Sequence, residues 1–160
     1  MKSSSIVTIA GKFLNGLLIQ ELRDQGHHLT GALENSINTS MSIENQRRQT
    51  IVHGFALDYA IKLNDPQPKD IPTVPELVKY FLLRGYSSFE ANQFAFLTHK
   101  RHLKEGMPTF ASKRFSKTGV RIRFIDRVWK SNEQKIDSKI ESGMDDIFFS
   151  EVNKQKSEVI

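Results

Sequence analysis

The spacing of apolar residues changes within residues 28–37, and this change constrains the fold more than any other feature. Leu29 and Leu33 are four residues apart, as on one face of a helix, whereas from Ile37 the apolar positions recur at every second residue. Gly31 permits backbone angles that a side chain would resist. The stretch therefore predicts a structural corner between a helix and a strand. The residues of this corner are Thr30, Gly31, Leu33 and Ile37.

An amphipathic pattern precedes the corner. Over residues 6–25 the apolar side chains gather on one helical face, with Phe13 and Leu17 among them, and Gly26 follows as a C-cap. We therefore predict an N-terminal helix that packs through this face.

An alternating pattern follows the corner and predicts two strands. Residues 36–44 form the first strand, with Ile37, Met41 and Ile43 on its buried face, and residues 44–47 form the turn. The second strand alternates through Ile51, His53, Phe55, Leu57 and Tyr59. The short turn predicts an antiparallel hairpin, which residues 59–63 continue as a third strand or a bend.

Four prolines make residues 64–75 an extended loop. Helical patterns over 76–84 and 88–104 then predict a helical hairpin over 75–105, with Gly85 at its corner. We assign the apolar face of the second helix to Phe89, Phe94 or Phe96, Leu97 and Leu103. Residues 109–120 read as a loop.

A long helical pattern begins at Arg121 and reaches about residue 150, with Gly143 as a break or kink. Its apolar stripe is Ile125, Trp129, Ile136 and Ile140. We expect this stripe to cover the hairpin, with Trp129, the single tryptophan, in the core.

Strands and helices are segregated along the chain, which predicts an α+β fold. The 160 residues have the size of one domain. We predict a single domain over 1–150, with the helical hairpin 75–105 as an insertion and a loose polar tail over 151–160.

Several classes of function lack support in the sequence. The chain has no cysteine, so disulfides and thiol chemistry are excluded. It shows no catalytic motif and no phosphate-binding loop, and we predict neither enzymatic activity nor a cofactor. His99 and His102 have a spacing that metal ligands use, but Lys100 and Arg101 between them disfavour a cation, and a solvated helix face is the better interpretation. No apolar run is long enough to span a membrane, and we expect a soluble intracellular product.

Charge is divided along the last helical pattern. Eight basic and two acidic residues give residues 113–135 a net charge of +6, whereas three basic and six acidic residues give residues 136–160 a net charge of −3. A solvated helix back explains this division, and so does head-to-tail docking between identical subunits. The interface residues of the docking hypothesis are Arg121, Arg123, Arg127, Lys130, Glu141, Asp145 and Asp146.

The helical hairpin 75–105 also resembles a helix-turn-helix. A recognition helix reads bases from its N-terminal residues, which here include Phe89 and Glu90, and a glutamate is unfavourable near phosphates. DNA binding by this hairpin therefore ranks second as a function.

The residues of the corner resemble a known family. His-Leu-Thr-Gly-Ala-Leu-Glu-Asn-Ser-Ile at residues 28–37 is similar to the corner of the tail-completion and neck proteins of tailed bacteriophages. Tyr59-Ala60 matches a Tyr-Ala of a later strand in that family, and Phe124-Ile125 resembles the aromatic start of its last helix. The chain departs from the family at residues 63–65, where Leu-Asn-Asp replaces a Glu and a Gly-Thr.

The resemblance implies a structural virion protein without enzymatic activity. Such proteins form oligomeric rings at the head–tail junction and join the portal side to the tail around a DNA channel. The implied partners are copies of the chain itself and the portal-side and tail proteins, with at most weak nonspecific DNA contact and no membrane. The implied location is the virion, after assembly in the host cytoplasm.

Overall fold

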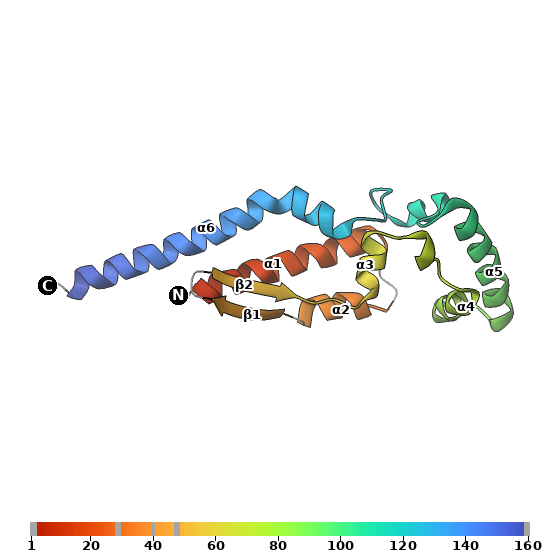
Figure 1. Ribbon diagram of the computed structural model, residues 1–160, viewed down its shortest axis with the longest axis horizontal. Coiled ribbons are helices and arrows are strands. Elements are labelled where there is room, and N and C mark those ends of the chain that lie inside the picture. The colour runs from red at the N-terminus through yellow and green to blue at the C-terminus, as the bar shows by residue number, and fades with distance from the viewer. Residues whose placement is uncertain (1–2, 28–29, 40, 47–48, 159–160) are drawn as a thin grey trace. The chain divides into compact units, whose positions relative to one another are not determined.

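The computed structural model describes residues 3–27, 30–39, 41–46 and 49–158 (Figure 1). Helices predominate, and a two-stranded antiparallel hairpin and a long last helix accompany them, so the α+β prediction is confirmed. The described residues group into two compact units where we predicted one domain. Unit 1 takes Met1–Glu21, Ala32–Leu57 and Ile125–Ile160, and unit 2 takes Leu22–Gly31 and Asp58–Phe124.

In unit 1, helix α1 (Ser3–Asp24) packs against the hairpin through a glycine (Figure 1). A Cβ atom added to Gly11 would lie 2.7 Å from the sulfur of Met41 and 3.2 Å from a methyl group of Val52. Because the first contact is too short for a Cβ atom and the second is tight, the glycine allows this close approach of helix and strands.

Helix α1 also contacts helix α6 (Phe124–Glu158). Near the end of α1, Arg127 Nε donates to the Glu21 carboxylate at 2.9 Å, and near its start Gly143 lies against Ile6. The two helices are therefore antiparallel. We predicted that α6 covers the hairpin, but its described contacts are with α1.

Helix α6 is longer than predicted and unbroken. It begins at Phe124 and not at Arg121, because Arg123 has a φ of 56°, a left-handed backbone through which an α-helix does not continue. We predicted a break or a kink at Gly143, and the helix does not break there. Residues 151–158, predicted as a loose tail, are part of the helix, and residues 159–160 lie outside the described residues.

The prediction that Trp129 is a core residue is wrong, because its side chain is 47% exposed. The buried apolar residues of α6 are Phe124, Val128 and Ile136, which are four or eight residues apart. Trp129 is displaced from this row by one residue, or about 100° around the helix. Ile125, on the same side as Trp129, is also exposed.

The hairpin pairs β1 (Met41–Gln46) with β2 (Gln49–Gly54) in an antiparallel register that sets Met41 opposite Gly54. The predicted antiparallel pairing is confirmed, but the turn is not at 44–46, which belong to β1, and residues 47–48 lie outside the described residues. Because β1 begins at Met41, residues after Gly54 have no strand opposite them. Phe55 and Leu57 are therefore not in a strand, and the predicted third strand is helix α3 (Tyr59–Asn64).

The first predicted strand begins too early. Residues 36–39 are the end of helix α2 (Ala32–Thr39), in which Leu33 and Ile37 are buried one turn apart. The amide of Asn15 on α1 donates to the Ile37 carbonyl at 2.7 Å. The four-residue spacing of Leu33 and Ile37 fits a helix, and the two-residue spacing of Ile37 and Thr39 fits a strand. Packing against α1 favours the helix.

Unit 2 contains the predicted helical hairpin, formed by α4 (Val74–Leu83) and α5 (Ser88–Glu105). Gly85 ends α4 with a φ of 86°, and Ser87 caps α5 by accepting a hydrogen bond from the backbone N–H of Glu90. Two short 3₁₀ helices, η1 (Pro68–Asp70) and η2 (Phe110–Phe115), lie within the predicted loops.

Of the predicted apolar face of α5, Phe94 packs against the rings of Phe81 and Tyr86, but the other members are largely exposed. Ala91 and Ala95 are its buried residues, whereas the large apolar side chains reach solvent, Phe89 with 73% of its surface. Small alanines let the two helices of the hairpin approach closely. The exposed apolar side chains of α5 are Phe89, Phe94, Phe96, Leu97 and Leu103.

Candidate functional site

The basic residues of the predicted interface divide between the two units. Arg121 belongs to unit 2, where its side chain is half-buried. Its guanidinium donates to three backbone carbonyls, those of Gln25 at 2.9 Å, Gly26 at 3.2 Å and Ser112 at 3.3 Å. The first two follow the end of α1, where a helix leaves carbonyls without helical partners. Burial lowers the pKa of Arg121, but an arginine side chain stays protonated. Arg121 thus joins segments of unit 2 to one another.

His27 completes this network. Its Nε2 donates to the carbonyl of Arg121 at 3.1 Å, and its Nδ1 lies 3.5 Å from an Arg121 guanidinium nitrogen, which leaves Nδ1 as the acceptor in the neutral imidazole. Burial, and after it the positive charge of Arg121, lowers the pKa of His27 from 6.5 to about 4. His27 is therefore neutral at physiological pH.

Three further basic residues lie around the first turns of α6. Arg123 is exposed, and its backbone N–H donates to the Asn64 carbonyl at 2.7 Å within unit 2. Arg127 is half-buried and bonded to Glu21 in unit 1, while Lys130 is exposed. Of these side chains, Lys130 is the one that borders a hollow of the surface.

That hollow is a groove of about 270 Å³ between α1 and α6 in unit 1. Leu14 and Leu18 line it from α1, and the half-exposed Ile125 and Trp129 line it from α6. Lys130 and Asp126 complete its lining, and Asp126 has an interaction within the chain. We call these six residues the groove. It presents an apolar floor to solvent with an exposed ammonium group beside it.

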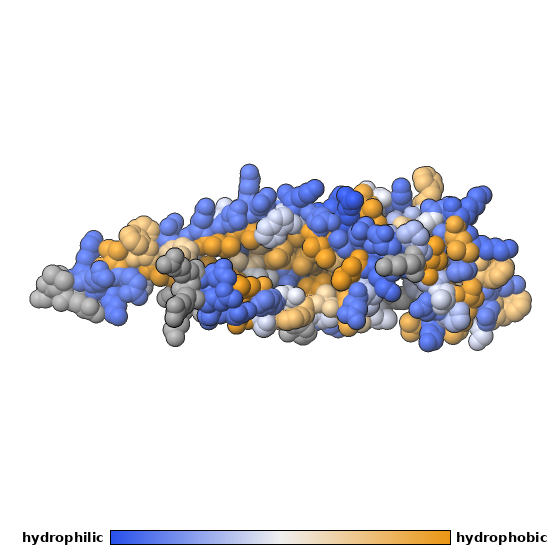
Figure 2. All heavy atoms as spheres, viewed as in Figure 1, coloured by the Kyte–Doolittle hydropathy of each residue, from blue (hydrophilic) through white to orange (hydrophobic). Residues whose placement is uncertain are grey.

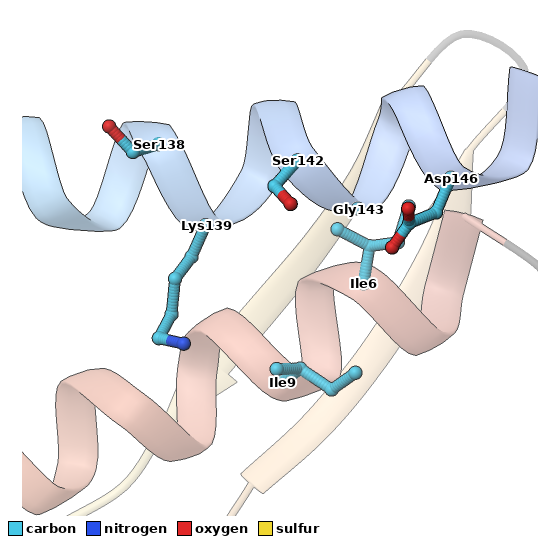
Figure 3. Close-up of a pocket in the computed structure, with 7 residues that line it drawn as sticks. All are labelled: Ile6, Ile9, Ser138, Lys139, Ser142, Gly143 and Asp146. Atoms are coloured by element: carbon cyan, nitrogen blue, oxygen red, sulfur yellow. The ribbon is translucent and has the colours of Figure 1, made fainter.

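The acidic residues of the predicted interface lie farther along α6. Glu141, Asp145 and Asp146 are all exposed. Asp146 lines a cleft of about 290 Å³ between α6 and the start of α1 (Figure 3). Figure 3 shows the Asp146 side chain directed towards Ile6, at the end of the cleft where Gly143 also lies. Asp146 therefore faces another side of α6 from Glu141 and Asp145.

Residues 144–158 of α6, which we call the arm, follow the contact between Gly143 and Ile6. Because Ile6 lies in the first turn of α1, the arm runs on beyond the start of that helix (Figure 1). Met144, Phe148 and Phe149 are exposed on the arm, Phe148 with 64% of its surface. Figure 2 shows apolar side chains at the surface over this part of α6. Four acidic and two basic residues give the arm a net charge of −2.

The corner residues divide between the units in the same way. Gly31, with a φ of 71°, is the last residue of the first segment of unit 2, and Leu33 and Ile37 are buried in unit 1. The Ser36 hydroxyl accepts from the backbone N–H of Leu57 at 3.2 Å, which joins α2 to the segment after β2. Thr30 is exposed. The corner thus has a structural role at the point where the chain passes from unit 2 to unit 1.

The described residues offer no cluster of metal ligands. His99 and His102 are half-buried instead of solvated, and Nδ1 of His99 donates to the Pro72 carbonyl at 2.9 Å. Across the same part of the chain, no helix combines the length and apolar character needed to cross a bilayer.

The sequence analysis did not predict that the groove and the arm expose apolar side chains. The lengths of the two helices could have indicated the exposed arm. Helix α1 has 22 residues and α6 has 35, so at about 1.5 Å per residue α6 exceeds α1 by roughly 20 Å. A helix cannot be covered along its whole length by a much shorter one. The apolar residues of its excess turns, Phe148 among them, therefore lack cover from α1.

Comparisons of the chain with models of protein families, with curated proteins and with solved structures gave no match.

Proposed function

We propose that the protein is a structural subunit without enzymatic activity that assembles head to tail with copies of itself into a closed ring. The observation that carries this proposal is the pair of unlike surfaces at the two ends of the α1–α6 pair. The groove exposes Trp129 and Lys130, and the arm exposes Phe148 among acidic residues.

Exposed apolar surface of this kind is removed from water when proteins associate. The two surfaces differ in shape and charge, so a copy of the chain does not bind another copy through the same surface twice. A contact between unlike surfaces is heterologous, and repetition of a heterologous contact closes into a ring or continues as a filament.

The resemblance of residues 28–37 to phage tail-completion and neck proteins supports the place of this ring. We propose that it lies at the head–tail junction of a tailed bacteriophage and joins the portal side to the tail around a channel for DNA. In this role the chain provides shape and contacts, and its partners are further copies and the neighbouring portal-side and tail proteins.

Native mass measurement tests the proposal. Light scattering and native mass spectrometry of the purified chain should give a defined oligomer, either alone or after portal-side or tail proteins are added, and electron microscopy should show closed rings. A chain that stays monomeric under both conditions, at concentrations of tens of micromolar, would contradict the proposal.

A DNA-binding function is the second candidate, and the charge of unit 2 favours it. Thirteen basic and seven acidic residues give unit 2 a net charge of +6, whereas unit 1 has a net charge of −1. Against base recognition, the Glu90 carboxylate at the start of α5 accepts hydrogen bonds from Ser87, which lower its pKa and keep it negative.

Competition binding separates the two functions. A neck component should bind DNA weakly, without sequence preference, and less as salt increases. A helix-turn-helix regulator should prefer its site by roughly 10³-fold or more. Tight and selective binding would favour the DNA-binding regulator over the neck protein as the function of this chain.

A further inference from the structure

The arm has an apolar face that the described residues leave uncovered. Met144, Phe148 and Val152 follow one another at intervals of four residues, so they lie along one side of the helix. Asp145 borders that side, and Glu141, which precedes the arm by one turn, lies along the same edge of α6. The arm therefore combines an apolar ridge with the Asp145 carboxylate along one edge.

The groove has the complementary character. Its apolar lining comes from Leu14, Leu18, Ile125 and Trp129, and the exposed ammonium group of Lys130 stands at its border. A cavity of about 150 Å³ holds one benzene ring, so a groove of about 270 Å³ has room for a phenylalanine side chain and part of a neighbour.

We propose that the arm of one copy occupies the groove of the next copy, with Phe148 in the apolar floor and Asp145 beside Lys130. This inference rests on the proposed self-assembly and names the surfaces that produce it. It is the helix-in-groove mode of recognition, in which an amphipathic helix places one face in an apolar channel.

Two physical arguments select a second copy as the occupant. Phe148 is 18 residues beyond Lys130 on one continuous helix, about 27 Å away, so an arm cannot reach the groove of its own chain. Two arms cannot pair well with each other either, because each has a net charge of −2. Lys130 offers the acidic arm a cation at one border of the groove, whereas the Asp126 carboxylate on the same lining already has an interaction within its own chain.

A mixing experiment tests the proposal. Phe148→Ser removes the arm's central side chain, and Trp129→Ala removes the groove's largest one. Each variant alone should need a protein concentration higher by roughly tenfold or more to assemble, as expected for residues at the centre of an interface. Each retains one intact surface, so an equimolar mixture should form a heterodimer and grow no further. Melting curves of both variants establish that they are folded.

Charge exchange provides the second test. Lys130→Glu and Asp145→Lys should each weaken assembly, and the chain that contains both should recover it because the attraction is restored with reversed sign. Lys135→Glu is the matched charge control, since Lys135 is about 140° around the helix from Lys130. Phe89→Ser in α5 is the matched aromatic control. Both controls should assemble as the unchanged chain does.

The outcomes distinguish this inference from the proposed function. If the unchanged chain forms rings and Phe148→Ser forms them equally well, the arm is not the docking element, and self-assembly stands on another surface. If both variants fail and their mixture also stays monomeric, the contact does not join arm to groove. A chain that is monomeric with all partners overturns both proposals.

Discussion

Arg121 and Lys130 belong to the same basic segment, yet their side chains have different surroundings. The guanidinium of Arg121 donates to three carbonyls inside unit 2, whereas the ammonium group of Lys130 is exposed beside the groove in unit 1. The sequence gives both residues the same charge in the same run. The difference between them lies in the backbone groups that the fold brings within reach.

The carbonyls around Arg121 explain its role. The end of α1 leaves acceptors without helical partners, and the partial negative charge of a helix C-terminus attracts a cation. Gly26 allows the chain to turn there with a φ of 71°. At the groove, by contrast, the walls are the sides of two helices, whose carbonyls are already bonded within the helices. A basic residue there stays available for a partner.

The largest effect that this comparison predicts follows from Arg121→Ala. Its loss leaves three carbonyls without their donor, and hydrogen bonds to charged groups contribute about 1.5–3 kcal/mol each. Because Arg121 is only half-buried, water replaces part of these bonds, so the variant should lose about 3–4 kcal/mol of unfolding free energy, less than the full sum. Lys130→Ala is the matched control and should change stability by less than about 0.5 kcal/mol. Urea unfolding of both variants measures the difference.

Equal losses of stability in Arg121→Ala and Lys130→Ala would contradict the different roles inferred for these two residues. A small loss for Arg121→Ala would mean that water replaces its hydrogen bonds at little cost. Arg121→Lys should not restore stability, because an ammonium group cannot reach three carbonyls as a planar guanidinium does.

The second prediction concerns pH and the neighbour of Arg121. The pKa of His27 is lowered from 6.5 to about 4, so between these values the unfolded chain binds a proton that the folded chain does not. The unfolding free energy is therefore unaffected by His27 above pH 6.5. As the pH falls towards 4, protonation of His27 in the unfolded chain lowers the unfolding free energy by about 2–3 kcal/mol. Unfolding free energies measured at intervals from pH 7.5 to 4 check the slope.

His27→Gln isolates this contribution, because glutamine does not titrate. The carboxylate of Glu90, whose pKa is lowered by hydrogen bonds from Ser87, also loses stabilisation as the pH falls below 4.5. Subtracting the curve of the variant removes such shared terms. If the two curves run parallel between pH 6.5 and 4.5, His27 is accessible to protons in the folded chain.

The contrast also shows what could be predicted from the sequence. The hairpin α4–α5 was predicted correctly because its signals are local: Gly85 ends one helix, and Ser87 with Glu90 forms a capping box at the start of the next. The bond between His27 and Arg121 joins residues 94 positions apart, and no local pattern indicates it.

Apolar patterns that fit two arrangements explain two of the failures. Leu33 and Ile37 satisfy a helix, while Ile37 and Met41 satisfy a strand, and contacts with α1 decide for the helix. Helix α6 has two adjacent apolar stripes, one that contains Trp129 and one that contains Val128. Packing in unit 1 buries the stripe with Val128 and leaves Trp129 half-exposed. The acidic and basic residues of the predicted interface were chosen from charge alone, whereas the groove also depends on Leu14 and Leu18 from another helix.

The third prediction compares two glycines within unit 1. Gly143→Ala places a Cβ atom 2.8 Å from a methyl group of Ile6, whereas Gly16 on α1 has no atom within 4 Å of an added Cβ atom. Alanine favours the helix by about 0.5–1 kcal/mol at either position, but overpacking costs about 1–3 kcal/mol at Gly143. Gly16→Ala should therefore raise the melting temperature and Gly143→Ala should lower it. Equal shifts would mean that α6 does not pack closely on α1 there.

The last prediction concerns the largest side chain of α6, for which we expect only a small change in stability. Trp129 is 47% exposed, so Trp129→Ala should cost about 1 kcal/mol, well below the 3–5 kcal/mol of a buried tryptophan. Ile136→Ala, at a position 5% exposed on the same helix, should cost more, about 2–5 kcal/mol. Urea unfolding at a concentration where the chain is monomeric separates this effect from assembly. A loss above about 3 kcal/mol for Trp129→Ala would make Trp129 a core residue, and the groove would then have no exposed apolar floor to receive an arm.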